Sequence, residues 1–187
     1  MLPPTARVKR AWRLGPVPEL TPTTGIGYRL SVESSRVKIR TLKKLLTLRD
    51  LWRWEGKKVV FTNGVFDILH AGHVQLLEKT RSLGDVLIVG LNSDASARGL
   101  GKGPERPVNK WDDRATVLCA LSCVDAVVGF EEDTPAELLE KLRPDILVKG
   151  GDYRKDQVAG RQSAGKVVII PLKKGYSTTG LIQRLRR

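Results

Sequence analysis

The sequence of residues 61–80 is FTNGVFDILHAGHVQLLEKT, and it contains both histidines of the 187-residue chain, His70 and His73. The apolar run before them ends in Asn63-Gly64 and predicts a buried strand, and the amphipathic run after them predicts a helix. The N-terminus of that helix offers free backbone N–H groups and the positive end of the helix dipole, which indicates an anion site. Gly72, between the histidines, lets a bulky group approach the backbone closely.

Two imidazoles at such a turn can donate hydrogen bonds to a phosphoryl group as charge develops on its oxygens. The alternative is structural, with His70 capping the loop and His73 packing against the helix. Because both histidines follow a buried strand in the pattern H-x-G-H, we favour the functional interpretation.

From about residue 40 the chain alternates between strand and helix patterns. Runs of Val, Ile and Leu predict strands at 58–64, 85–94, 124–130, 145–151 and 166–172. Helices are predicted at 41–56, 73–84, 111–122, 134–144 and 177–187, with Thr134 as an N-cap and Pro135 at the first helical position. Residues 95–109 predict a polar loop.

Continuous apolar strands that alternate with helices are typical of a parallel sheet covered on both faces. We therefore predict an α/β fold, a Rossmann-like doubly wound parallel sheet of about five strands. The ligand of such a sheet is expected beyond the carboxyl ends of the strands, near the topological switch point.

The net charge of +13 is concentrated at the front of the chain. Residues 1–58 carry 14 Lys and Arg against 4 Asp and Glu, whereas residues 59–187 carry 19 against 16. Residues 1–38 contain five prolines and no apolar periodicity, which predicts a disordered basic extension before a domain at 39–187. A transit peptide and a nucleic-acid-binding arm are the alternatives for this extension.

The remaining composition favours a cytoplasmic protein. No apolar run approaches the roughly 20 residues that span a membrane, and residues 1–15 contain no apolar core of a signal peptide. Cys119 and Cys123 lie four residues apart in a predicted helix, so we expect both to face the core in the reduced state.

The segment TNGVFDILHAGH resembles the H-x-G-H nucleotidyltransferase superfamily. Further segments resemble the heptose-1-phosphate adenylyltransferases, which occur alone or as the C-terminal half of a bifunctional enzyme of lipopolysaccharide heptose synthesis. These segments are LNSD (91–94), RPVN (106–109), DDRATVL (112–118), FEEDTP (130–135), LVKGGDY (147–153) and GYSTTGLI (175–182). The resemblance implies transfer of AMP from ATP to D-glycero-β-D-manno-heptose 1-phosphate, which gives ADP-heptose and pyrophosphate.

On this resemblance, His70 and His73 stabilise the transferred α-phosphate, and Ser177, Thr178 and Thr179 bind the β- and γ-phosphates. A plain N-cap, which needs a single hydroxyl, is the alternative for this last group. Asp67 either fixes its loop or contacts magnesium, and we favour the first role. Further nucleotide contacts are expected from two strand ends, namely Thr62, Asn63, Gly64 and Phe66, and Lys149, Gly150, Gly151 and Asp152. A merely solvated loop is the alternative for the second strand end.

The sugar phosphate is expected on the other side of the pocket. Arginine suits its phosphate through bidentate contacts, and Asn or Asp suits vicinal hydroxyls. The predicted contacts are Asn92, Asp94, Arg106, Asn109 and Arg114, with Lys102 as an addition from a Gly-rich loop. We expect Mg²⁺ to be held mainly by the ATP phosphates and water, with no metal-ligating side chains. We further expect a homo-oligomer, in the simplest case a dimer, and no membrane or nucleic-acid partner.

Three features depart from the family pattern. Val65 replaces a usual cysteine, Gly180 replaces a common asparagine, and the segment DQVAGRQSAGKV (156–167) is shorter than usual before the last strand. Two other functions stay open at this point. One is cytidylyl or adenylyl transfer to another small phosphate, such as glycerol 3-phosphate or phosphoethanolamine. The other is a non-catalytic module that binds nucleotides or nucleic acid.

Overall fold

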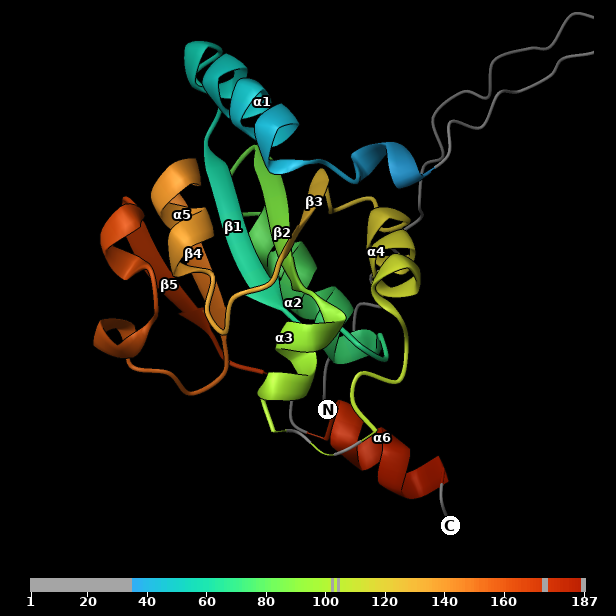
Figure 1. Cartoon of the computed structure of the whole chain (residues 1–187). Helices are drawn as coiled ribbons and strands as arrows, with labels where there is room; N and C mark the ends of the chain where they lie inside the picture. The colour runs from blue at the N-terminus through green and yellow to red at the C-terminus, as the bar shows by residue number, and fades with distance from the viewer. Residues whose placement is uncertain (1–34, 102, 104, 173–174, 186–187) are drawn as a thin grey trace, which may run out of the picture. The chain divides into compact units, whose positions relative to one another are not determined.

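The computed structural model describes residues 35–101, 103, 105–172 and 175–185, and its centre is a five-stranded parallel sheet (Figure 1). The strand order is β3-β2-β1-β4-β5. The strands are β1 (Val59–Gly64), β2 (Val86–Asn92), β3 (Ala126–Phe130), β4 (Ile146–Gly150) and β5 (Lys166–Ile170). The predicted α/β, doubly wound Rossmann-like sheet is confirmed.

Helices lie on both sides of this sheet (Figure 1). They are α1 (Leu42–Trp54), α2 (Ala71–Arg81), α3 (Asp94–Gly99), α4 (Trp111–Cys119), α5 (Ala136–Leu142) and α6 (Thr178–Leu185). Among the described residues, three short 3₁₀ helices accompany them, η1 (Ser35–Lys38), η2 (Lys155–Gln157) and η3 (Arg161–Ser163).

Two core clusters arise because successive strand residues point to opposite faces of the sheet. On one face, Val60 and Leu87 pack with residues of α2 and α4, such as Leu77 and Leu118. On the other face, the neighbouring strand residues pack with Leu45 of α1 and with the leucines of α5. The strands are therefore mostly apolar, with polar residues toward the ends of β1, β2, β4 and β5, as in other sheets that are covered on both faces.

The strand order reverses at β1. The chain runs from β1 outward to β2 and β3, and then crosses to β4 on the other side of β1. The carboxyl ends of β1 and β4, at Gly64 and Gly150, thus flank the switch point at which ligands of doubly wound sheets bind.

Two local predictions are wrong. Residues 95–99, predicted as part of a loop, and Asp94, predicted as the end of a strand, form α3, which begins where the Ser93 side chain accepts a hydrogen bond from the Ser96 N–H. At α5, Pro135 and not Thr134 occupies the N-cap position, with φ −79° and ψ 18° and no side-chain capping bond.

The described fold also begins earlier than residue 39. Residues 35–38, which we assigned to the extension, form η1, and Lys38 Nζ donates to the Leu121 carbonyl oxygen at 3.0 Å. Ile39 then makes an isolated parallel bridge with Val127 of β3. The rest of the predicted extension, 1–34, lies outside the described residues.

Cys119 is buried in the core as predicted, whereas Cys123 lies beyond the end of α4 and is half-buried against the same cluster. Burial raises the pKa of both thiols. Among the helices of the described residues, none has the length and apolar character that a membrane span requires.

Candidate functional site

A cavity of about 470 Å³ opens at the carboxyl ends of β1 and β4, between the N-terminus of α2 and the start of α6. Many of the residues predicted from the sequence line this main cavity. They are Asn63, Gly64, Phe66, His70, Gly72, His73, Arg106, Lys149, Gly150, Ser177, Thr178 and Thr179. The structure therefore brings the H-x-G-H turn and the S-T-T segment together.

His70 is the N-cap of α2, and its Nδ1 accepts a hydrogen bond from the His73 backbone N–H at 3.3 Å. The two imidazole rings stack, with centroids 3.8 Å apart and planes inclined by 11°. The His73 ring also meets the Phe66 ring edge-on at 5.3 Å. Burial lowers the pKa of His70. His70 thus caps the helix and His73 packs against a neighbouring ring, which are the structural roles that we gave as alternatives. Both residues also line the cavity.

Gly72 lies close to the segment before α6. A Cβ at this position would lie 2.9 Å from Tyr176 Cβ and 3.1 Å from the His70 ring. Real Cβ atoms do not tolerate the first of these distances, so Tyr176 or the turn would have to move. Any side chain at residue 72 would therefore disturb the contact between the two halves of the cavity wall.

The three hydroxyl residues at the start of α6 differ in their contacts. Ser177 Oγ accepts a hydrogen bond from the Gly180 N–H at 3.0 Å, so it acts as the helix cap. A Cβ at Gly180 would lie 2.9 Å from this oxygen. Ser177 therefore has the role that we gave as the alternative, a helix N-cap formed by one hydroxyl. Thr178 and Thr179 line the cavity beside it.

Lys149 connects the ends of the two central strands. Its Nζ donates to Asn63 Oδ1 at 3.3 Å and lies 5.4 Å from the centre of the Tyr153 ring. The next residue, Gly150, lines the cavity, but Gly151 and Asp152 do not. Asp152 is exposed. The structure thus gives no pocket contact to these last two predicted residues, because the chain has already turned away from β4.

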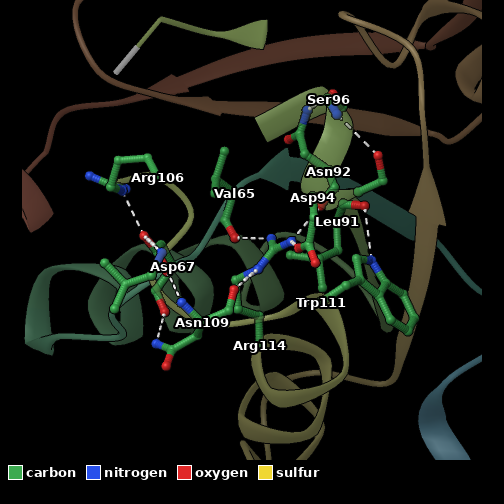
Figure 2. Close-up of polar contacts among 12 residues, drawn as sticks. Val65, Asp67, Leu91, Asn92, Asp94, Ser96, Arg106, Asn109, Trp111 and Arg114 are labelled. Carbon is green, nitrogen blue, oxygen red and sulfur yellow. Dashed lines mark hydrogen bonds and ion pairs between the residues drawn. The ribbon is translucent and has the colours of Figure 1, made fainter. Parts of the chain in front are cut away.

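Asp67 fixes the loop of residues 106–109 (Figure 2). Its Oδ2 accepts from Arg106 Nε at 2.6 Å and from the Val108 N–H at 2.9 Å, and its Oδ1 accepts from the Asn109 N–H at 2.9 Å. Asn109 Nδ2 in turn donates to the Asp67 carbonyl oxygen at 2.8 Å. Asp67 is buried in these loop-fixing contacts, and Arg106 lines the main cavity.

Arg114 is only 1% exposed, and its guanidinium is surrounded by protein acceptors (Figure 2). Nη1 donates to the Val65 carbonyl oxygen at 2.6 Å, and Nε donates to the Asn109 carbonyl oxygen at 3.0 Å. Nη2 donates to the Asn92 carbonyl oxygen at 2.9 Å and to Asp94 Oδ1 at 2.7 Å. These contacts engage the guanidinium within the protein, and the direct contact with a sugar phosphate that we predicted for Arg114 stays a prediction.

Other predicted contacts are engaged inside the protein as well. Thr62 Oγ1 donates to the Val148 carbonyl oxygen at 3.0 Å and is buried between β1 and β4. Asn92 Nδ2 donates to Ser96 Oγ at 2.9 Å, and the Asp94 carboxylate pairs with Arg114. Lys102 lies outside the described residues.

Sequence reasoning missed part of the cavity wall. Val65, Leu76, Tyr153, Leu172 and Tyr176 also line the cavity. The two tyrosines belong to the motif segments LVKGGDY and GYSTTGLI. Their place in these motifs could have identified them as cavity residues. Among the described residues, no group of three or more His, Cys, Asp or Glu side chains is placed to hold a metal ion.

Comparison with curated proteins gives several relatives, each called bifunctional protein HldE. Identity is 59% over 138 residues with the relative from Magnetococcus marinus, a match that covers 72% of this chain and 28% of the relative. It is 60% over 139 residues with the relative from Mesorhizobium japonicum, with the same two coverages. The relative from Syntrophotalea carbinolica is 54% identical over 152 residues, or 79% of this chain and 31% of the relative. The chain thus spans about three-tenths of the length of these relatives.

Many solved structures are similar to this chain, and two of them illustrate the range of sequence identity. A lipopolysaccharide core biosynthesis protein from Thermoplasma volcanium has 28% identity and a TM-score of 0.54, and the match covers 65% of this chain and all of that one. A pantoate–β-alanine ligase from Francisella tularensis has 16% identity and a TM-score of 0.52, over 80% and 79% of the two chains, and shows the shared fold alone. Residues 61–184, more than half of the sequence, match the family model described as cytidylyltransferase-like. The chain therefore belongs to the cytidylyltransferase-like family.

Proposed function

We propose that the chain transfers the adenylyl group of ATP to D-glycero-β-D-manno-heptose 1-phosphate and releases pyrophosphate. One observation carries this proposal: a single cavity at the switch point gathers both histidines, Lys149, Arg106 and the hydroxyl-rich start of α6. Such a set of donors suits a polyphosphate. The similarity to HldE proteins and to a lipopolysaccharide core biosynthesis protein supports a sugar phosphate as the acceptor.

In the proposed reaction, a phosphate oxygen of the acceptor attacks the α-phosphorus of ATP. The bond from that phosphorus to the oxygen that bridges to the β-phosphate breaks, and pyrophosphate leaves with the electron pair. The attacking phosphate is already ionised, so the reaction needs no general base. The protein's tasks are then positioning and the stabilisation of charge.

The chain's residues divide these tasks. His70 and His73 lie at the α-phosphate, where their hydrogen bonds strengthen as charge develops. Thr178 and Thr179 bind the β- and γ-phosphates, and the cations Lys149 and Arg106 offset the negative charge. Mg²⁺ enters with the nucleotide, held by its phosphates and by water.

The test is pyrophosphate release by the full chain with Mg²⁺, a panel of nucleoside triphosphates and a panel of acceptors. The acceptors are heptose 1-phosphate, glycerol 3-phosphate and phosphoethanolamine. We expect release with ATP and heptose 1-phosphate and much less with every other pair. Release with glycerol 3-phosphate or phosphoethanolamine alone would instead show transfer to another small phosphate.

Two further parts of the proposal concern the chain as a whole. We propose that the catalytic domain begins at about residue 35 and that the preceding basic segment is not needed for catalysis. We also propose a homodimer, which light scattering on the full chain tests. A monomer mass under assay conditions would contradict it.

A further inference from the structure

A second cavity, of about 290 Å³, adjoins the main cavity. Asn63, Gly64, Val65, Lys149 and Tyr153 line both cavities and therefore form their junction. The second cavity, which we call the side cavity, extends from this junction to the loop between β3 and α5 and to the segment around η2.

The two ends of the side cavity differ in charge. Lys149 supplies a cation at the junction, whereas Asp133 lines the side cavity but not the main one. A ligand that spans both cavities would thus place an anionic group near Lys149 and an uncharged group with hydrogen-bond donors near Asp133. Carboxylate oxygens accept hydrogen bonds from hydroxyl groups.

The polar side chains at the far end of the side cavity are available to a ligand. Within residues 35–101, 103, 105–172 and 175–185, the side chains of Asp133, Thr134 and Gln157 make no hydrogen bond or ion pair. Thr134 does not cap α5, because Pro135 occupies the N-cap position. Three exposed residues that carry a carboxylate, a hydroxyl and an amide therefore line the same cavity without a partner for these groups among the described residues.

We propose that the side cavity holds the hydroxyl-bearing carbon chain of the acceptor, and that Asp133, Thr134 and Gln157 determine which acceptor is used. This inference rests on the proposed function, since it assigns the acceptor end of the same site. The short ammonium chain of phosphoethanolamine would leave most of a 290 Å³ cavity to water. A sugar fills more of the cavity and can satisfy all three side chains.

The experiment measures binding and turnover in parallel on the full chain. Heptose 1-phosphate is titrated by calorimetry, and pyrophosphate release is followed with ATP. Asp133→Asn and Thr134→Val remove one polar function each at nearly constant shape. Glu131→Gln is the matched control, because Glu131 is an exposed carboxylate in the same loop that does not line either cavity.

We expect Asp133→Asn and Thr134→Val each to weaken heptose 1-phosphate binding and raise its KM about tenfold, the usual effect of one lost hydrogen bond. The KM for ATP should change less than about twofold, and Glu131→Gln should behave as the unmodified chain. Glycerol 3-phosphate, which has a shorter carbon chain with fewer hydroxyl groups, should be affected less than heptose 1-phosphate by both substitutions. Melting curves confirm that the variants are folded.

Two results would separate failure of this inference from failure of the proposed function. If the chain releases pyrophosphate with heptose 1-phosphate but both variants bind it normally, the side cavity is not the acceptor site. In the other case, the unmodified chain binds heptose 1-phosphate and both substitutions weaken this binding, but no triphosphate supports pyrophosphate release. The assignment of the acceptor site would then hold, and the proposed transferase function would be wrong. Absence of binding by the unmodified chain would overturn the inference outright.

Discussion

The Nδ1 atom of His70 accepts a hydrogen bond from the backbone N–H of His73 at 3.3 Å, and the rings of the two residues are stacked. One side chain therefore both begins α2 and lines the main cavity. A substitution at His70 combines two effects, the loss of a helix cap and the loss of a ligand contact. A suitable pair of variants can separate them.

The first prediction compares His70→Ala with His70→Asn. Asparagine is a good N-cap and alanine is not, so only His70→Ala should lower the free energy of unfolding, by about 1 kcal/mol. Both variants should lower turnover by about 10²-fold, because both remove the imidazole donor. ATP affinity should fall much less than turnover, since the contact strengthens in the transition state. Denaturant unfolding, ATP titration and pyrophosphate release measure the three quantities, and full activity of folded His70→Asn would rule out the catalytic role.

The second prediction concerns pH. Burial lowers the pKa of His70 below its usual value of 6.5, so just below that pH the unfolded chain binds more protons than the folded chain. The contribution of His70 to stability is thus fully present above pH 6.5 and is lost as the pH falls through the folded pKa. His70→Asn should therefore lose less unfolding free energy than the unmodified chain between about pH 7.5 and about pH 5.5. Equal losses, measured by urea unfolding at both pH values, would contradict the assignment.

The third prediction tests the approach of Tyr176 to the turn. Gly72→Ala places a Cβ 2.9 Å from Tyr176 Cβ, so the segment before α6 must move away from the turn. We expect ATP affinity to fall at least tenfold, because Thr178 and Thr179 move with that segment. Gly99→Ala is the control, since the nearest atom to its new Cβ is Asp133 Oδ1 at an ordinary 3.5 Å. If Gly72→Ala bound ATP as well as the control does, the position of the segment before α6 would not depend on the space left at Gly72.

The fourth prediction follows from the buried contacts of Arg114. Arg114→Met removes four hydrogen bonds and leaves the Val65, Asn92 and Asn109 carbonyl oxygens without this donor. The free energy of unfolding should fall by about 3 kcal/mol, and Arg114→Lys should recover only part of it, because one ammonium cannot reproduce the planar fork. Denaturant unfolding measures both variants. A stable Arg114→Met variant whose only defect is a raised KM for the sugar phosphate would instead support the predicted contact of Arg114 with that substrate.

The fifth prediction concerns the start of the chain. Deletion of residues 1–34 should leave turnover within a few-fold of the full chain. Deletion of residues 1–40 should in addition lower the melting temperature, because it removes the Lys38 contact with Leu121 and the bridge of Ile39 to β3. Turnover and melting curves on both truncated chains decide the matter. Equal stability of the two would show that η1 contributes nothing to the fold.

The sheet could be predicted from the sequence because each strand is a continuous apolar run, and only a sheet covered on both faces buries such runs completely. The position of the histidines at the switch point followed from the same pattern, since a strand end and a helix start meet there. The short helix α3 could not be predicted, because its six residues are too few to show a helical period.

Arg114 shows which contacts residue type alone does not reveal. An arginine in a motif segment suggests that the residue binds an anion. Its role depends on which acceptors surround it in the fold. Because every residue has a backbone carbonyl group, the sequence does not show which of them will accept from the guanidinium. Three of its four bonds go to such carbonyls, those of Val65, Asn92 and Asn109. Asp67 is the acidic partner of Arg106. We had predicted that Asp67 fixes its loop, but the sequence did not indicate that Arg106 is the residue it binds.

The cap at the start of α2 also determines a tautomer. A ring nitrogen that accepts a backbone hydrogen bond cannot carry a proton, so Nδ1 of neutral His70 is bare and the single proton is on Nε2. The helix thereby selects Nε2–H as the donor that His70 can offer to a ligand, before any ligand arrives. It follows that protonation of His70 does more than add charge, since the second proton must take the lone pair that accepts the His73 N–H, which then keeps only its 2.8 Å bond to the His70 carbonyl oxygen.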